Sequence, residues 1–115
     1  MKEFTQFFGF SFFFGIIIFA VGVVLFYFPP KKINGLYGYR TPASMQSPET
    51  WKFAQRYSAI RAMIAGALAM VLSLLIHMME LNDDLDLAGE IAVILFTVLY
   101  LIIGTERAIN KRFPK

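Results

Sequence analysis

The residues best suited to binding chemistry lie in one polar loop and in the helix start that follows it. Arg40 offers a planar guanidinium that binds carboxylate or phosphate through two parallel hydrogen bonds, and Gly38 permits a close turn of the backbone before it. The candidate ligand- or partner-binding residues of this segment are Asn34, Gly38, Arg40, Thr41, Pro42, Glu49, Trp51 and Arg56. A plainer interpretation remains open, in which Arg40 meets lipid phosphate and Trp51 anchors the chain at the membrane interface.

A second group of polar residues flanks a short acidic connection further along the chain. Glu90 lies about one turn inside the apolar run that follows this connection, and an ionisable group at that depth is a functional candidate. With His77 and Glu80, and with Asp86 beside them, it forms a candidate outer polar cluster for an ion pair, a proton or a weakly held metal. The alternatives are a carboxylate at the water boundary, pointing outward or bonded to a helix start, and an interfacial His77 without a ligand role.

The composition excludes several classes of chemistry. The chain has no cysteine, which removes disulfides, thiol nucleophiles and cysteine metal sites. It also lacks a phosphate-binding glycine loop, a Gly-x-Ser-x-Gly motif and a metal-ligand motif, so we expect neither a cofactor nor a metal. Its basic residues follow the distribution that a cytoplasmic membrane surface requires, so no nucleic acid is expected as a partner.

The elements that must position these residues are apolar enough to cross a membrane. Hydrophobic residues make up 57% of the chain and charged residues only 17%, a balance typical of integral membrane proteins. We therefore expect one all-α membrane domain over residues 1–115, with three transmembrane helices. The predicted spans cover about residues 5–28, 61–79 and 87–106.

Residues 29–60 connect the first two spans and hold the candidate loop. The prolines that follow Phe28 stop the first helix, and Ser47 followed by Pro48 predicts the start of the next one. We expect this next helix to begin as an interfacial amphipathic helix and to lead into the second span. Arg61 lies at the junction, where it either pairs with a carboxylate inside the bundle or extends to lipid phosphate.

Basic residues are distributed unevenly among the connections. The segment between the first two spans holds Lys31, Lys32, Arg40, Lys52, Arg56 and Arg61, and the tail after the third holds Arg107, Lys111, Arg112 and Lys115. The connection between the second and third spans holds none. The positive-inside rule therefore predicts a multi-pass protein of the cell membrane with its N-terminus outside and its first loop and C-terminus in the cytoplasm.

Small and polar residues form a stripe along one face of each predicted span. These stripes are Ser11, Gly15 and Gly22 in the first, Ala62, Gly66, Ala69 and Ser73 in the second, and Asp86, Glu90, Thr97, Gly104 and Ala108 in the third. Because small residues let helices approach closely in lipid, the stripes predict a tight bundle and also permit a homo-oligomer.

The loop and helix start together resemble a known signature. The string NGLYGYRTPASMQSPETWKFAQRYSA is similar to the signature of the SdpI family, in which Asn precedes Gly-x-Arg-Thr-Pro and an acid stands two residues before Trp. The matching residues are Asn34, Gly38, Arg40, Thr41, Pro42, Ser44, Glu49, Trp51, Arg56, Ser58 and Ala59. The resemblance implies a bacterial membrane protein of a family linked to immunity against a secreted peptide toxin and to signalling by repressor sequestration.

Three classes of function remain open. The first is a non-enzymatic immunity or signalling module that binds an antimicrobial peptide toxin or a cytoplasmic regulator. The second is a small oligomeric transporter or a lipid-binding protein, in which Arg40 and Asn34 hold an anionic headgroup of membrane lipid. The third is a membrane enzyme acting at the cytoplasmic surface, which we do not expect because Glu49 is explained as a helix-start acid.

Overall fold

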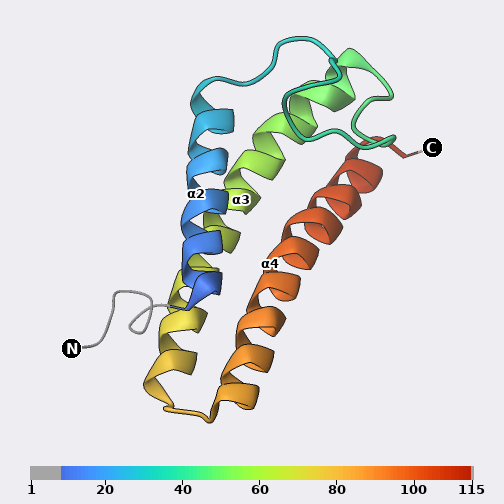
Figure 1. Cartoon of the computed structure of the whole chain (residues 1–115). Helices are drawn as coiled ribbons and strands as arrows, with labels where there is room; N and C mark the ends of the chain where they lie inside the picture. Colours follow the sequence, from blue (N-terminus) through green and yellow to red (C-terminus); the bar gives the residue numbers. More distant parts are fainter. Residues whose placement is uncertain (1–8, 115) are drawn as a thin grey trace.

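The computed structural model describes residues 9–114, which form three long helices and no strand. The helices are α2 (Phe10–Tyr27), α3 (Pro48–Met78) and α4 (Asp83–Arg112). They lie side by side in an elongated bundle in which α3 runs antiparallel to its two neighbours (Figure 1). All three are long and apolar enough to cross a membrane, which confirms the predicted all-α class and the number of spans.

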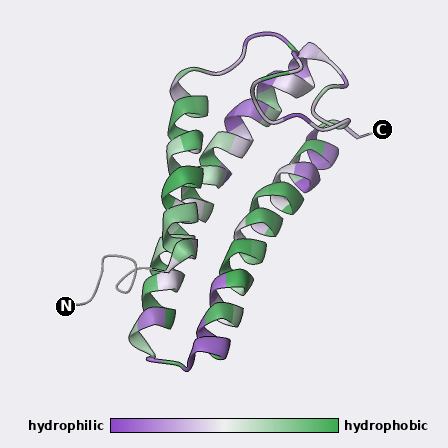
Figure 2. Cartoon of the chain, in the orientation of Figure 1, coloured by the Kyte–Doolittle hydropathy of each residue, from purple (hydrophilic) through white to green (hydrophobic). Residues whose placement is uncertain are grey.

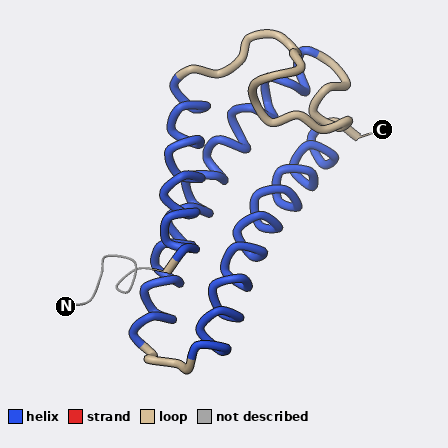
Figure 3. The backbone as a smooth tube through the Cα atoms, viewed as in Figure 1, coloured by secondary structure: helices blue, strands red, loops and turns tan. Residues whose placement is uncertain are grey.

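The polar parts of the chain gather at the two ends of the bundle. Figure 2 shows apolar residues along the middle of the three helices and hydrophilic residues at both ends. The described connections also lie there, with the long loop over one end and the short turn between α3 and α4 at the other (Figure 3). The loop, the start of α3 and the end of α4 therefore share one end, which we call the basic end.

Each helix begins for a local reason. The Ser47 side chain accepts a hydrogen bond from the Thr50 amide at 3.1 Å, which confirms the predicted start of α3. Asn82 caps α4 in the same way, by accepting from the Leu85 amide at 2.9 Å. The residue at the corresponding position before α2 is Gly9, which has no side chain to act as a cap.

The helix bounds differ from the predicted spans at the third helix. The segment expected to lead into the second span forms one continuous helix with it, α3, from Pro48 to Met78. The third helix is longer than the predicted span of residues 87–106, because it begins at the Asn82 cap and ends only at Arg112. The beginning of the predicted first span, residues 5–8, lies outside the described residues.

Glycines set the approach of α2 to α3. A Cβ atom added to Gly66 would lie 2.5 Å from the carbonyl oxygen of Gly15, and one added to Gly22 would lie 2.8 Å from the carbonyl oxygen of Ala59. The stripe residues of both helices are buried, as predicted: Ser11, Gly15, Gly22, Ala62, Gly66, Ala69 and Ser73. The backbones of α2 and α3 are therefore in direct contact.

The stripe on α4 faces the other helices less completely. Glu90 and Thr97 are buried, whereas Asp86, Gly104 and Ala108 are only partly covered. At Gly104 the missing side chain leaves room for the guanidinium of Arg61, which a Cβ atom would contact. The third helix thus packs through a few polar and small positions.

Replacing Gly66 by alanine should destabilise the bundle. The new Cβ atom would force the backbones of α2 and α3 apart, and overpacking of this kind costs about 1–3 kcal/mol. We expect a lower melting temperature of the purified chain, measured by circular dichroism in a fixed detergent. Gly35→Ala is the matched control, because no atom lies within 4 Å of the Cβ position there. Equal melting temperatures for the two variants would contradict the close approach.

Candidate functional site

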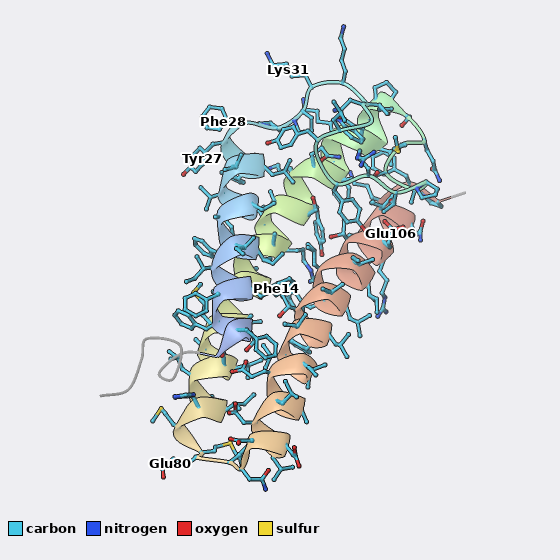
Figure 4. All side chains as sticks on the ribbon, viewed as in Figure 1. Phe14, Tyr27, Phe28, Lys31, Glu80 and Glu106 are labelled. Carbon is cyan, nitrogen blue, oxygen red and sulfur yellow. The ribbon has the colours of Figure 1, made fainter. Side chains whose placement is uncertain are left out.

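The connection between α2 and α3, residues 28–47, crosses the basic end of the bundle and is attached to every helix. We call this segment the motif loop. It leaves α2 at Phe28 and covers a small apolar core made of Ala43, Ala54 and Ile109. Figure 4 shows Glu106 of α4 near this end and Glu80 at the opposite end of the bundle. Because the three core residues come from the loop, α3 and α4, the loop is packed against the helices.

The first attachment joins the loop to the start of α3. The Trp51 indole N–H donates to the carbonyl oxygen of Pro30 at 2.9 Å. The side chain is 1% exposed, so the tryptophan is buried under the loop. The interpretation of Trp51 as an anchor at the membrane interface is therefore wrong for this arrangement.

Asn34 organises the beginning of the loop. Its Oδ1 accepts from the amides of Leu36 at 2.9 Å and Tyr37 at 2.7 Å, and its Nδ2 donates to the carbonyl oxygen of Lys32 at 3.0 Å. The Tyr37 hydroxyl then donates to the carbonyl oxygen of Phe28 at 2.6 Å. The asparagine side chain thus uses both of its polar atoms to hold the backbone in a turn.

The second attachment is a two-way pairing between Gln55 of α3 and the backbone of Tyr39. The glutamine Oε1 accepts from the Tyr39 amide at 2.6 Å, and its Nε2 donates to the Tyr39 carbonyl at 2.8 Å. The neighbouring Gly38 has φ of +108°, a conformation that favours glycine. A Cβ atom at Gly38 would also lie 2.5 Å from the glutamine oxygen. Gly38 is therefore required both for the turn and for this pairing.

The third attachment joins the loop to α4 through Glu106. One oxygen of this carboxylate accepts from the Tyr39 hydroxyl at 2.8 Å and from the Thr41 hydroxyl at 2.9 Å. Thr41 and Ser44 also exchange hydrogen bonds, since each amide donates to the other hydroxyl, at 2.9 and 3.1 Å. Pro42 lies exposed inside this turn.

The electrostatics of Tyr39 favour its neutral form. Burial raises the pKa of the Tyr39 phenol well above its ordinary value, and the hydrogen bond to the Glu106 carboxylate raises the pKa further. The phenol therefore keeps its proton at physiological pH and remains a donor to Glu106.

The charged residues of the signature face outward. Arg40, Glu49 and Arg56 are exposed, in contrast to Trp51 and Gln55. The Arg56 guanidinium lies 5.0 Å from the centre of the Phe26 ring. A cavity of about 480 Å³ lies between the end of α2 and the start of α3, and Glu49 and Arg56 line it. The structure thus separates the signature into residues that hold the loop and residues that it exposes.

At the opposite end of the bundle, Glu90 joins all three helices. This residue is 1% exposed. Its carboxyl group accepts hydrogen bonds from the Ser11 hydroxyl, from the Ser11 backbone amide at 3.3 Å and from the Ser73 hydroxyl at 3.2 Å. It approaches Gly9 so closely that a Cβ atom there would collide with it. Glu90 therefore caps the start of α2 from α4, in place of the cap that Gly9 cannot provide.

The remaining members of the predicted outer polar cluster do not complete a site with Glu90. Glu80 is exposed in the turn after α3, with φ of 51°, and His77 and Asp86 are partly buried about one helical turn from Ser73 and Glu90. No group of three or more His, Asp or Glu side chains among residues 9–114 is placed to hold a metal ion. Glu90 is thus buried and not at the water boundary, and its carboxyl group bonds to the start of α2.

Comparison with known proteins identifies the family. A sequence model of the SdpI/YfhL protein family matches residues 31–105, which include the loop, α3 and most of α4. The chain belongs to the SdpI/YfhL family. The protein YfhL of Bacillus subtilis (strain 168), itself uncharacterized, is 42% identical over 62 residues, or 54% of this chain and 56% of that protein. The chain thus spans about half the length of this curated relative. No solved structure matches the chain.

The SdpI/YfhL signature therefore coincides with the attached loop. The signature predicts Asn34, Gly38, Thr41 and Trp51 as site residues, but it includes neither Gln55 nor Glu106. A helical wheel sorts residues by polarity alone, so it places Gln55 on the polar face of the predicted amphipathic helix. The available signal was the aromatic and small character of its helical neighbours Trp51, Ala54 and Ser58, all three of which are buried in the structure.

Gln55→Leu should loosen the loop without unfolding the bundle. The substitution keeps most of the side-chain volume but leaves the Tyr39 amide without a partner and its carbonyl with the Ser44 hydroxyl alone, a loss of about 1–3 kcal/mol. We expect faster hydrogen exchange at the Tyr39 amide, measured by mass spectrometry in detergent. Gln46→Leu, at an exposed glutamine of the same loop, is the matched control and should leave this exchange unchanged.

Glu90→Leu should destabilise the other end of the bundle. It removes the acceptor for the Ser11 amide and for two buried hydroxyl groups, which costs about 1–3 kcal/mol. Glu90→Gln keeps one acceptor oxygen, so we expect a smaller fall in melting temperature. Equal effects of the two variants would show that the carboxyl group does not cap α2.

Proposed function

We propose that the chain is a non-enzymatic immunity or signalling module of the cell membrane, which binds a cytoplasmic regulator through the exposed face of the motif loop or a membrane-active peptide at the opposite, acidic end. The observation that carries the proposal is the division of the signature. Asn34, Gly38 and Thr41 hold the backbone, whereas Arg40 between them is exposed. A basic side chain on a fixed loop is suited to recognising an acidic group of a partner.

Attachment of the loop supports binding because it fixes the backbone on both sides of Arg40. Gln55 and Glu106 hold Tyr39 on one side of Arg40, and Glu106 also holds Thr41 on the other side. A loop fixed in this way loses little conformational entropy when a partner binds, so more of the contact energy contributes to affinity. An ordinary surface connection would not need hydrogen bonds to two different helices.

The distribution of charge supports the orientation within the proposal. Basic residues gather at the end that carries the loop, so this end faces the cytoplasm by the positive-inside rule, with the first turns of α3 at the membrane interface. The opposite end carries exposed acidic residues at the start of α4, Asp83 and Asp84. In the immunity form of the proposal, this outer end attracts cationic peptides electrostatically.

Photo-crosslinking from the loop tests the proposal. A photoreactive amino acid replaces Met45, an exposed residue whose amide bonds to the Thr41 carbonyl, and crosslinking is done in native membranes. We expect a specific protein or peptide band that Arg40→Ala removes while the level of inserted protein stays the same. The same probe at Asp84 is the control for position. Crosslinks to phospholipid alone, or a band indifferent to Arg40→Ala, would contradict the proposal.

A survival assay separates immunity from signalling. Cells that express the chain are exposed to a panel of membrane-active cationic peptides beside cells that lack it. In the immunity form, expression raises survival against at least one peptide, and replacing Asp83 and Asp84 by asparagine lowers the gain. Survival unchanged across the panel excludes the immunity form and leaves the cytoplasmic partner identified by crosslinking.

A further inference from the structure

A basic groove runs between α3 and α4, and no residue of the loop lines it. Its cavity of about 990 Å³ is lined by residues that include Arg61, Gly104, Arg107, Lys111 and Arg112. The lining contains four cationic side chains and no carboxylate. Glu106, the acidic residue of this part of α4, is engaged by Tyr39 and Thr41 of the loop. The positive charge of the groove is therefore not balanced within it.

Arg61 forms the inner end of the groove. Its Nη2 donates to the carbonyl oxygen of Tyr100 at 2.8 Å, and its guanidinium lies 3.8 Å from the centre of the Tyr100 ring. Its Nε atom is buried and has no hydrogen-bond partner. The guanidinium is thus held in a fixed position, with its Nε enclosed against α4 in the space that Gly104 leaves open.

The lining of the groove changes from basic to apolar along the bundle. A second hollow of about 260 Å³ shares Arg61, Gly104 and Arg107 with the first and continues over Phe96, Leu99 and Ile103, away from the basic end. These three apolar side chains are exposed. Cationic groups therefore lie at one end of the groove and an open apolar surface at the other.

The spacing of the cations fits the edge of a bilayer. Gly104, beside Arg61, and Lys111 are separated by about 10 Å along α4 at the usual helical rise. The most deeply placed cation therefore lies where α4 changes from apolar to basic, and the others lie toward water. This is the depth at which lipid phosphate meets the first part of the acyl chains.

We propose that this groove binds an anionic phospholipid, with the headgroup phosphate on Arg61, Arg107 and Lys111 and one acyl chain along Leu99 and Ile103. Arginine guanidinium groups bind phosphate through paired hydrogen bonds, and both Arg61 and Arg107 line the groove. The apolar continuation identifies a lipid as the source of the phosphate, since a free phosphate ion makes no use of it. The inference does not rest on the function proposed for the loop.

Native mass spectrometry of the full chain in detergent tests the proposal. Dioleoylphosphatidylglycerol is titrated against the protein, with dioleoylphosphatidylcholine as the zwitterionic comparison. We expect a one-to-one adduct with phosphatidylglycerol and about tenfold weaker binding after Arg107→Gln, because a charge-assisted contact to phosphate is lost. Lys111→Gln should weaken binding in the same direction. Both residues are exposed, so these variants should fold.

Arg40→Gln is the matched arginine control, because Arg40 does not line the groove. This variant should keep phosphatidylglycerol binding even where it loses a crosslinked partner, so failure of one proposal is distinguishable from failure of the other. Arg61→Gln should abolish the adduct, with circular dichroism to check that helix content is retained. If this variant unfolds, the Arg107 and Lys111 variants decide.

Several results would overturn the lipid site. These are equal binding of the two lipids, unchanged binding after Arg107→Gln, or an equal loss after Arg40→Gln, which would indicate attraction by net charge alone. Displacement of the lipid by an equal concentration of inorganic phosphate would assign the groove to a free phosphate ion. A stable dimer that excludes lipid from the groove would assign it to a second copy of the chain.

Discussion

The direct backbone contact between α2 and α3 sets the position of the other parts of the structure. Lipid chains are as apolar as the helix surfaces, so helices in a bilayer associate through close packing more than through the hydrophobic effect. The contacts of Gly15 with Gly66 and of Gly22 with Ala59 fix the register of the antiparallel pair. The same register brings Pro30 to Trp51 at one end and Ser11 near Ser73 at the other.

Hydrogen bonds between polar groups then connect each end of the α2–α3 pair to α4. At one end Glu90 serves two helices at once, through the start of α2 and the Ser73 hydroxyl of α3. At the other end Gln55 and Glu106 hold the same loop residue, Tyr39, from different helices. Unsatisfied polar groups are costly away from water, so these bonds specify one arrangement of helices that packing alone would leave less defined.

The features that follow from local pattern could be predicted from the sequence, and those that depend on tertiary partners could not. Long apolar runs, the Ser47 cap and the stripes of small residues are properties of one segment, and the structure confirms them. The signature was recognised, but its division into attached and exposed residues depends on contacts with α3 and α4. Glu90 was identified from its depth, yet its role as a cap follows from the missing cap at Gly9 on another helix.

The attachment of neighbouring loop residues to different helices has a mechanical consequence. Tyr39 is tied by its backbone to Gln55 of α3, while its hydroxyl and that of Thr41 are tied to Glu106 of α4. A sliding movement of α3 past α4 would pull these hydrogen bonds in opposite directions. Either one set of hydrogen bonds would break or the backbone around Arg40 would turn and change the direction of its side chain. Such a movement of the two helices would therefore change the direction of the Arg40 side chain at the basic end of the bundle.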